Sequence, residues 1–460
     1  MRFWLLPIAA IVLFSLLTVG CRSRPTPSVL STPASAAQTR AEQEALRKWK
    51  NNGFEVAVTR DETLPARPVV SLKLSTKTEV MLERNEKNEA ILKPDPPFQD
   101  SLLDGLEAFP HLRTLRLSSC WINGTGLSHL KEHAQIRELN LSSSHIEDAG
   151  LKALPALPNL EKLDLGATEI TDASMKELLR HPNLAHLKLP WPGNLTAAGL
   201  SALAEFPALT QVDAGCGKTH GDSELMALAA IPRLEYLSFT SGDVTKAGLA
   251  RLADRRTLRS LHLWLDRVDE DGIVELRRLP ELDRFALIGA SVTDKSVAAI
   301  ARLDTLRHLS LESTNNLTAD GLRPLGRMTN LESLKLLTVV GDIERGMEHI
   351  GRLTNLQELS LWTSTVGDAG LAHLAMLTHL RLFNLNVSSE SKITSAGLRH
   401  LAAMTELENL DLFKSKVTDN DVDFLMKFKK LKHIDLRFSQ LTPTGAERLR
   451  KALPAAEVQY

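Results

Sequence analysis

Residues 160–184 read LEKLDLGATEITDASMKELLRHPNL, and this stretch decides the fold. Its first six residues have the spacing of a short strand that turns three leucines to one side: Leu160, Leu163 and Leu165. Thr171 then offers a favourable helix N-cap, Asp172 places an acid in the first turn, and apolar residues recur at helical spacing after it. The helix is predicted to stop before Pro182, because the residue before a proline resists the α region. One unit thus consists of a strand, a turn, a helix and a segment that leads back to the next strand.

The opening phrase of this unit, an apolar residue followed three residues later by a strand pattern of the L-x-L type, occurs fourteen times. Its first residues are Leu112, Ile136, Leu160, Leu184, Leu209, Leu234, Leu258, Leu282, Leu306, Leu331, Leu356, Leu380, Leu407 and Leu431. They are 24 or 25 residues apart, except for one interval of 27. A fixed period in this range indicates a solenoid whose core grows by addition of units. The prediction is an α/β solenoid with parallel strands on one side and helices on the other.

The pattern resembles the leucine-rich repeat family over roughly residues 69–460. The strand phrase followed by [IV]-T-D-x-G-L-x-x-L resembles its cysteine-containing and GALA-type subclass, found in exported proteins of planctomycete-like bacteria; residues 244–249 and 366–371 are clear instances. The resemblance implies a right-handed horseshoe with strands on the concave face and helices on the convex face. Many such repeats bury an asparagine after the strand. Here small residues such as Cys120, Ser144 and Thr168 stand in its place, and we expect hydroxyl groups to take over part of its bonding.

The N-terminus has the pattern of an export signal. A positive start at Arg2 is followed by an uncharged apolar run over residues 3–17. Residues 18–21 (TVGC) resemble the lipobox of bacterial lipoproteins, which implies lipidation of Cys21 and a membrane anchor. An ordinary cleaved signal and an uncleaved anchor are the alternatives. Arg22 after the cysteine favours the outer membrane, so we expect an exported lipoprotein of the cell envelope in the outer membrane or facing the periplasm.

The chain is predicted to have four segments. Residues 1–21 are the signal, and residues 22–37, rich in Pro, Ser and Thr, form a flexible tether. Residues 38–111 form an N-terminal cap with a degenerate first repeat, because the ends of a solenoid need atypical units to cover the core. Residues 112–460 carry the fourteen repeats and the C-terminal cap.

Composition limits the partners and the chemistry. The chain has 55 Lys and Arg against 56 Asp and Glu, so it has no overall field that would attract nucleic acid, and we expect no nucleic-acid partner. Cys120 and Cys216 belong to the first and fifth repeats. Four strand spacings separate them by about 19 Å, which is too far for a disulfide.

Three motifs suggest chemistry but have simpler explanations. Residues 215–219 (GCGKT) end like a phosphate-binding loop, yet the first glycine of that motif is missing. His129 and His133 have a zinc-compatible spacing, but we expect both on the solvated outer face of a helix. The acidic run from Asp266 to Asp271 lacks the order of a calcium loop and is expected to form a turn and a helix start. We therefore predict no catalytic residues, metal or cofactor, and no enzyme.

The concave surface is the predicted binding site. The seventh residue of each phrase is expected to be exposed there, and in the second half of the chain five of these residues are apolar: Trp264, Ile288, Leu337, Trp362 and Phe413. His262 and Lys335 are predicted polar neighbours. Clustered apolar surface marks interaction sites, and Trp is favoured at binding hot spots. The first half is interpreted as support and the second half as the site of a protein or peptide ligand.

Two other functions fit the same sequence. The solenoid can be a structural scaffold of the envelope without a specific ligand, its apolar side chains covered by other segments or packed on one another. It can also bind a glycan, with Trp264 and Trp362 as stacking platforms.

Overall fold

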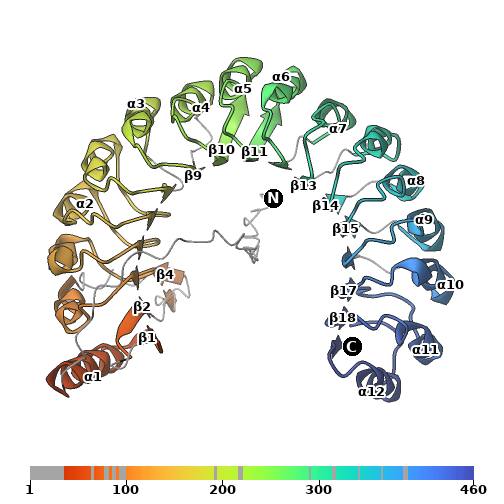
Figure 1. The fold of residues 1–460 in the computed structure, drawn as a ribbon, viewed down its shortest axis with the longest axis horizontal. Coiled ribbons are helices and arrows are strands. Elements are labelled where there is room, and N and C mark those ends of the chain that lie inside the picture. Colours follow the sequence, from red (N-terminus) through yellow and green to blue (C-terminus); the bar gives the residue numbers. More distant parts are fainter. Residues whose placement is uncertain are drawn as a thin grey trace.

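The computed structural model describes residues 36–63, 67–76, 82–84, 90–92, 100–190, 194–215, 221–289, 292–312, 317–339, 342–363, 366–386 and 392–460. These residues form an open horseshoe, with strands along the concave side and helices along the convex side (Figure 1). The predicted α/β solenoid is confirmed. The signal, Cys21 and almost all of the tether lie outside the described residues.

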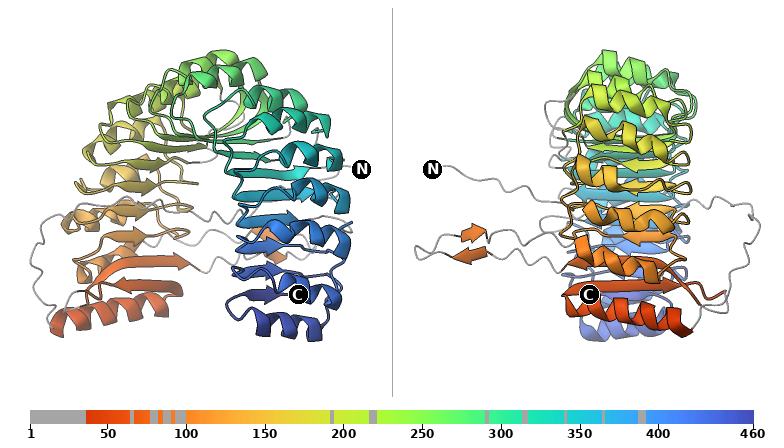
Figure 2. Two further views of the ribbon diagram at one scale, coloured as in Figure 1. Left: turned by 45° about the vertical axis from the view of Figure 1, so that its right-hand side comes forward. Right: turned by 90° about the vertical axis from the view of Figure 1, so that its left-hand side faces the viewer.

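One sheet of 17 strands follows the whole arc in the described chain. β1 (Phe54–Arg60) pairs antiparallel with β2 (Val69–Thr76), and every later pairing in this sheet is parallel. The other strands of the sheet are β5 (Thr114–Arg116), β6 (Glu138–Asn140), β7 (Lys162–Asp164), β8 (His186–Lys188), β9 (Gln211–Gly215), β10 (Tyr236–Val244), β11 (Ser260–Val268), β12 (Arg284–Ile288), β13 (His308–Glu312), β14 (Ser333–Val339), β15 (Glu358–Thr363), β16 (Leu382–Asn386), β17 (Asn409–Asp411), β18 (His433–Asp435) and β19 (Glu457–Gln459). A separate antiparallel pair, β3 (Leu82–Arg84) and β4 (Ala90–Leu92), stands outside this sheet (Figure 2).

The repeated leucines form one continuous buried core. Residues at the same place in successive phrases are paired in register, as in Leu237, Leu261, Phe285 and Leu309, and all four are buried. Burying such a side chain stabilises the fold by about 1.5–3 kcal/mol. Each unit therefore gains most of its stability from the two units beside it.

Strand length changes along the arc. β5–β8 and β17–β19 have three residues each, whereas β9–β16 have five to nine. In four of the short strands the last residue is Asn or Asp, and its side chain accepts the backbone N–H two residues later: Asn140, Asp164, Asp411 and Asp435. One residue further on, the backbone takes a left-handed conformation, at Ser143, Ala167, Lys414 and Phe438. These Asx turns end the strand early.

The convex side mixes α-helices with 3₁₀ helices. The α-helices are α1 (Ala36–Asn51), α2 (Asp148–Ala153), α3 (Ala197–Ser201), α4 (Asp222–Leu228), α5 (Lys246–Leu252), α6 (Glu270–Glu275), α7 (Asp294–Ile300), α8 (Met347–Ile350), α9 (Asp368–Leu374), α10 (Ser395–Arg399), α11 (Val422–Leu425) and α12 (Pro443–Ala452). Other units have only 3₁₀ turns, including η3 (Asp172–Ser174) and η4 (Lys176–Arg180), where the sequence predicts an α-helix. A 3₁₀ helix rises about 2.0 Å per residue against 1.5 Å for an α-helix, so a short segment spans the unit with fewer residues.

A ladder of Asp–Thr pairs links the starts of neighbouring helices. The Asp148 carboxylate accepts both the backbone N–H of Thr171, at 2.9 Å, and its hydroxyl, at 2.6 Å. Five further pairs repeat the arrangement: Asp172–Thr196, Asp222–Thr245, Asp294–Thr318, Asp368–Thr394 and Asp419–Thr442. The glycine of the T-x-x-G-L segment packs against the same carboxylate, and a Cβ on Gly397 would overlap Asp368. The motif thus encodes the contact between units.

Two hydroxyl residues bond to the backbone at the place where many similar repeats bury an asparagine, as expected. The Thr168 hydroxyl donates to Leu165 O at 2.6 Å, and Ser144 donates to Leu117 O at 3.2 Å. Cys120 lies 3.3 Å from Leu74 O, and burial raises the pKa of its thiol to about 12. The thiol is therefore a neutral core group. Cys216, the other predicted unpaired cysteine, lies outside the described residues.

Candidate functional site

Two tryptophans stand out on the concave side. Trp264 on β11 is 54% exposed and Trp362 on β15 is 45% exposed. Both occupy the seventh position of their phrase, which lies inside the strand because β11 and β15 extend past the point where shorter strands end. The long strands therefore hold these two rings on the sheet itself.

The other predicted apolar residues do not complete one stripe. Ile288 lies beside Trp264, and Glu312 lies between Ile288 and Leu337 in the register of the sheet. Leu336 of β14 pairs with Leu361 of β15, and the register of the two strands becomes irregular directly after this pair. Leu337 and Trp362 are the next residues of these two strands, and they form a second group. Ile288 and Leu337 are half-buried. The result is two apolar groups separated by one carboxylate.

The predicted polar neighbours have different environments. The His262 ring meets Tyr236 edge-on, with centroids 5.2 Å apart, and burial holds the pKa of His262 below its usual value. Lys335 is exposed on β14, opposite Ser310 of β13. Burial raises the pKa of Glu312 although Ser310 and Lys335 oppose that shift. Burial on this face thus disfavours the charged forms of both His262 and Glu312.

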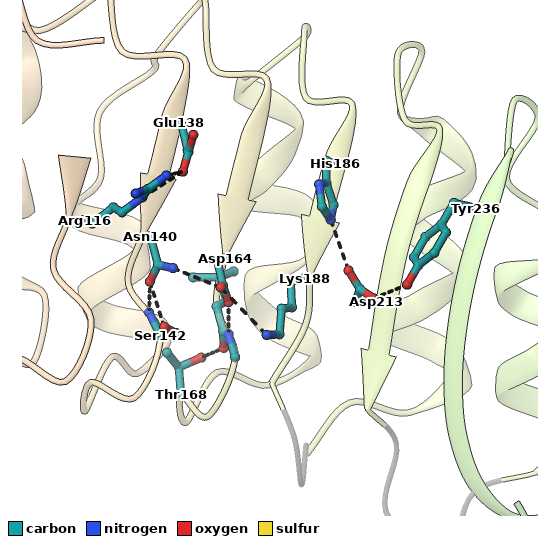
Figure 3. A network of polar contacts seen from close by, with 12 residues as sticks. Arg116, Glu138, Asn140, Ser142, Asp164, Thr168, His186, Lys188, Asp213 and Tyr236 are labelled. Atoms are coloured by element: carbon teal, nitrogen blue, oxygen red, sulfur yellow. Dashed lines mark hydrogen bonds and ion pairs between the residues drawn. The ribbon is translucent and has the colours of Figure 1, made fainter. Parts of the chain in front are cut away.

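The first half of the concave face carries a polar network that the sequence analysis missed (Figure 3). Asp213 accepts the Tyr236 hydroxyl at 3.1 Å and lies 3.1 Å from His186 Nε2. Burial, followed by the charge and hydrogen bond of Asp213, raises the pKa of Tyr236. Arg116 donates to Glu138 at 2.7 Å, and the Asn140 amide donates to Asp164 at 3.0 Å. Because these groups already pair with one another, a ligand would have to break existing contacts to use them.

Phe413 lies away from the tryptophans. β17 ends at Asp411, so Phe413 belongs to the turn after the strand and is half-buried there. This corrects the prediction of a strand position. Its ring packs edge-on against Phe438, with centroids 5.1 Å apart, and Phe438 is 74% exposed. The strand pattern does not single out Phe438, because Phe438 is the eighth residue of the last phrase and follows the exposed seventh residue, Arg437.

A polar hollow of about 540 Å³ lies where the chain enters successive strands. It is lined by Arg307, Asn330, Glu332, Asn355, Gln357, His379, Arg381 and Glu406. Arg307 pairs with Glu332, and the two asparagines donate to backbone carbonyls of the preceding unit. These side chains are held by contacts between units, and none belongs to the predicted site.

The motifs set aside in the sequence have structural roles where they are described. His133 is buried, with Nε2 3.0 Å from Leu106 O, so the expectation that it lies on the outer face is wrong. His129 instead meets Asp104 at 3.3 Å, and the two histidines do not share a site. Asp269 caps α6 by accepting the Gly272 N–H at 3.1 Å. Of the GCGKT segment, only Gly215 is described.

Two segments of the chain match a known family of repeats. Residues 110–131 and 135–154 match the family described as Leucine Rich repeat. The chain folds as a leucine-rich repeat solenoid. Repeats of this kind generally serve as protein-interaction modules rather than enzymes, and they present extended concave binding surfaces. No curated protein matches the sequence.

Solved structures with a similar fold include bacterial and yeast proteins. An internalin from Listeria monocytogenes is 17% identical, over 82% of this chain and 91% of that chain, with a TM-score of 0.37. A leucine-rich repeat protein from Leptospira interrogans is 18% identical, over 80% and 93%, with a TM-score of 0.46. The Rad7–Elc1 complex of yeast matches at 21% identity, over 73% and 86%, also with a TM-score of 0.46. At these identities the likeness concerns the fold alone.

Within the part of the chain that the structure describes, none of the helices combines the length and apolar character needed to cross a bilayer.

Proposed function

We propose that this leucine-rich repeat protein is a non-enzymatic module that binds a protein or peptide on the concave face between β11 and β15. The observation that carries the proposal is the exposure of Trp264 and Trp362 on neighbouring parts of that face. Ile288 and Leu337 extend the two apolar groups, and His262 and Lys335 supply polar contacts at their edges.

Covering the two rings would supply a substantial part of the free energy of binding. A Trp side chain buries roughly 150–250 Å² in an interface, and about half of each ring is exposed here. Covering roughly 100 Å² on each at about 25 cal/mol per Å² contributes about 2.5 kcal/mol per ring. Two such anchors give a ligand a clear preference for this region over the self-paired polar surface of the first half.

The test compares the wild-type chain with Trp264→Ala, Trp362→Ala and the double variant in partner capture from cell-envelope extract. Met376→Ala is the matched control, because Met376 is 67% exposed in the turn after α9 on the convex side. We expect the double variant to lose the partners that wild type and the control retain. Unchanged capture by the double variant contradicts the proposal. Retention on polysaccharide columns that depends on the two tryptophans supports the glycan alternative instead.

We further propose that the module is a cell-envelope lipoprotein of the planctomycete type, anchored through Cys21. Support comes from the apolar run at residues 3–17, the lipobox-like residues 18–21 and the T-D-x-G-L segments of the repeats. A Cys21→Ala chain is expected to leave the detergent phase and to lose labelling by a fatty-acid probe. If this variant partitions into detergent as the wild type does, the lipid anchor is not at Cys21.

A further inference from the structure

The return segments, which lead from each helix back to the next strand, differ in charge between the two halves of the solenoid. A return segment runs from five residues before the first residue of a phrase to one residue after it. In the six units from Leu112 to Leu234 these segments contain five Lys or Arg and five Asp or Glu. In the eight units from Leu258 to Leu431 they contain 14 Lys or Arg and 7 Asp or Glu. The nearly neutral chain therefore concentrates positive charge on the return segments of its second half.

One position of these segments holds an arginine in four consecutive units. It lies four residues before the phrase, and we call its occupants the arginine row: Arg278, Arg302, Arg327 and Arg352, all of them exposed. The Arg278 guanidinium pairs with Asp254, which has the same position in the preceding unit. Arg352 Cδ lies 3.4 Å from where a Cβ on Gly326 of the preceding unit would be. Side chains at this position thus follow one another from unit to unit.

Most acids of these eight segments are already paired, whereas many of the cations are not. Among the described residues, six of the seven acids lie in ion pairs, and Asp304 is the exception. In the same part of the chain, six cations have no ion pair, side-chain hydrogen bond or ring contact: Arg255, Arg256, Arg277, Arg302, Arg327 and Lys429. All of these are exposed except Arg255, which is half-buried. The unpaired positive charge is therefore available to an external anion.

The return segments share one side of the horseshoe, the side on which the chain enters the strands. Seen edge-on, the ends of the stacked units line up along two opposite sides (Figure 2). Neighbouring units are about 4.8 Å apart at their strands and about 8–10 Å apart at their helices, so the arginine row extends over roughly 15–30 Å of this side. We call the Lys and Arg side chains of the return segments from the Leu258 unit to the Leu431 unit the basic return face.

The first described helix begins on the same side. β1 starts at Phe54, which pairs with Thr76 at the end of β2, so β1 runs from the strand-exit side to the strand-entry side. α1 ends just before β1 and lies beside it (dark red in Figure 2). Because a helix of 16 residues is about 24 Å long, its first residue, Ala36, lies near the strand-entry side. The ion pair between Glu42 of α1 and Arg60 at the end of β1, at 2.9 Å, agrees with this direction.

We propose that the basic return face docks on an anionic membrane surface, with its unpaired arginines bound to the phosphate groups of lipid headgroups. Guanidinium groups suit phosphate, and clusters of Lys and Arg are attracted to anionic lipid surfaces. The lipid anchor proposed at Cys21 would join the fold at Ala36, on the same side, through residues 22–36, which can span at most about 50 Å. The docking goes beyond the concave-face function and depends on neither Trp264 nor Trp362.

A stiff anionic polymer, such as a nucleic-acid duplex, is the other partner with suitable charge. The unpaired cations extend from Arg255 in the Leu258 unit to Lys429 in the Leu431 unit, along a large part of the arc (Figure 1). A straight polymer that follows the arginine row leaves the curved stack before it reaches Lys429. A flat surface contacts the whole side at once, and the distribution of charge therefore favours a membrane.

The test measures sedimentation of the full chain with vesicles, with Cys21→Ala in every protein so that no lipid anchor contributes. Vesicles of equal parts phosphatidylcholine and phosphatidylglycerol are compared with vesicles of pure phosphatidylcholine. We expect at least about tenfold tighter binding to the mixed vesicles, and added salt should weaken this preference. The triple variant Arg277→Gln, Arg302→Gln, Arg327→Gln should bind the mixed vesicles at least about tenfold more weakly and leave binding to pure phosphatidylcholine unchanged.

A second triple variant, Lys295→Gln, Arg345→Gln, Lys416→Gln, is the matched control. These three cations are exposed, have no side-chain partner among the described residues, and lie at or just before helix starts on the strand-exit side. The control removes the same charge from the opposite side and should bind both kinds of vesicle as the parent chain does.

Equal binding of the parent chain to the two kinds of vesicle, or an equal loss in both triple variants, overturns the proposal. Binding to a DNA duplex that depends on the three arginines, without binding to vesicles, overturns it in favour of a soluble polyanion. The Trp264→Ala, Trp362→Ala double variant should bind the mixed vesicles normally, so failure of the concave-face function and failure of the basic return face are distinguishable.

Discussion

Among single residues, His181 gives the protein a defined response to acid. It is buried on the convex side, where its Nδ1 accepts the Leu157 N–H at 3.2 Å. Burial, aided by the charge of Arg180, lowers the pKa of His181 from 6.5 to about 4. The folded state therefore binds fewer protons than the unfolded state between these pH values. Stability from the neutral ring is complete above pH 6.5 and is lost as the pH falls toward 4, by about 3 kcal/mol.

His181→Leu tests this response, because leucine occupies the equivalent place at Leu157 and Leu279. Denaturant unfolding at several pH values is expected to show a shallower fall in the variant between pH 6.5 and pH 4, by up to about 1.4 kcal/mol per pH unit. His262 and His308, whose pKa values burial lowers, and Glu312 and Asp411, whose pKa values burial raises, remain in both proteins and contribute to the residual slope. Parallel profiles for the two proteins would falsify the assignment to His181.

Phe438 allows a stability prediction that is independent of any ligand. Phe438→Asn relieves a left-handed phenylalanine, which costs roughly 1 kcal/mol, and loses an edge-on ring contact worth about 0.5–1.5 kcal/mol. We expect a net change in the free energy of unfolding within about 1 kcal/mol. Leu436→Ala, two residues earlier and buried, should cost about 2–5 kcal/mol. A large loss in Phe438→Asn would mean that the ring is retained for stability.

Among secondary-structure elements, the Asp–Thr ladder predicts coupling between adjacent helices. Asp368, at the start of α9, accepts the Thr394 N–H at 2.8 Å and its hydroxyl at 2.6 Å, and Gly397 of α10 packs on the same carboxylate. Asp368→Ala should cost about 2 kcal/mol, because a backbone donor and a hydroxyl lose their acceptor. Gly397→Ala should cost at least as much through steric overlap.

The double variant distinguishes a shared contact from two separate defects. Removing the Asp368 carboxylate makes room for part of the methyl group that Gly397→Ala adds, so the double loss should be smaller than the sum of the single losses by at least about 0.5 kcal/mol. Asp423→Ala is the surface control: Asp423 pairs with Arg448 while 79% exposed, and its loss should stay within about 0.5 kcal/mol. Additive losses at Asp368 and Gly397 would show that the two helices are not coupled there.

The elements also show what the sequence was able to predict. The leucine period predicts the strands and their order, because every inward residue must be buried and only stacking of units buries it. The leucine period does not distinguish an α-helix from a 3₁₀ helix. The segments Asp172–Ser174 and Lys176–Arg180, predicted as α-helix, are therefore 3₁₀ helices without contradicting the period. Four of the short strands end at an Asn or Asp that accepts a backbone N–H of the following turn, as at Asp411, and this signal is present in the sequence.

The site was predictable in part for the same reason. Trp264 and Trp362 are found from position alone, since the seventh residue of the phrase lies on the concave side of a long strand, and both side chains are exposed there. The Asp213 network joins side chains from three phrases, and only strand register brings them together. Phe438 depends on a turn that the strand pattern does not describe.

At the scale of the whole molecule, the curvature follows from the two kinds of layer. Strands in a sheet lie about 4.8 Å apart, whereas packed helices need about 8–10 Å between axes. Each unit is therefore a wedge, narrow on the concave side, and the stacked wedges close into the arc of Figure 1. The 17 strands are joined only to their neighbours, so no contact in the described sheet ties one end of the arc to the other.

This one-dimensional arrangement predicts that damage stays local. Phe383 on β16 is fully buried, and Phe383→Ala should cost about 3–5 kcal/mol. Because units are stabilised mainly by neighbours, we expect hydrogen exchange to accelerate from β15 to the C-terminus while β6–β9 keep their protection. Met376→Ala, a nearby exposed substitution, should change neither region. Uniform acceleration along the arc would mean that the solenoid unfolds as one unit.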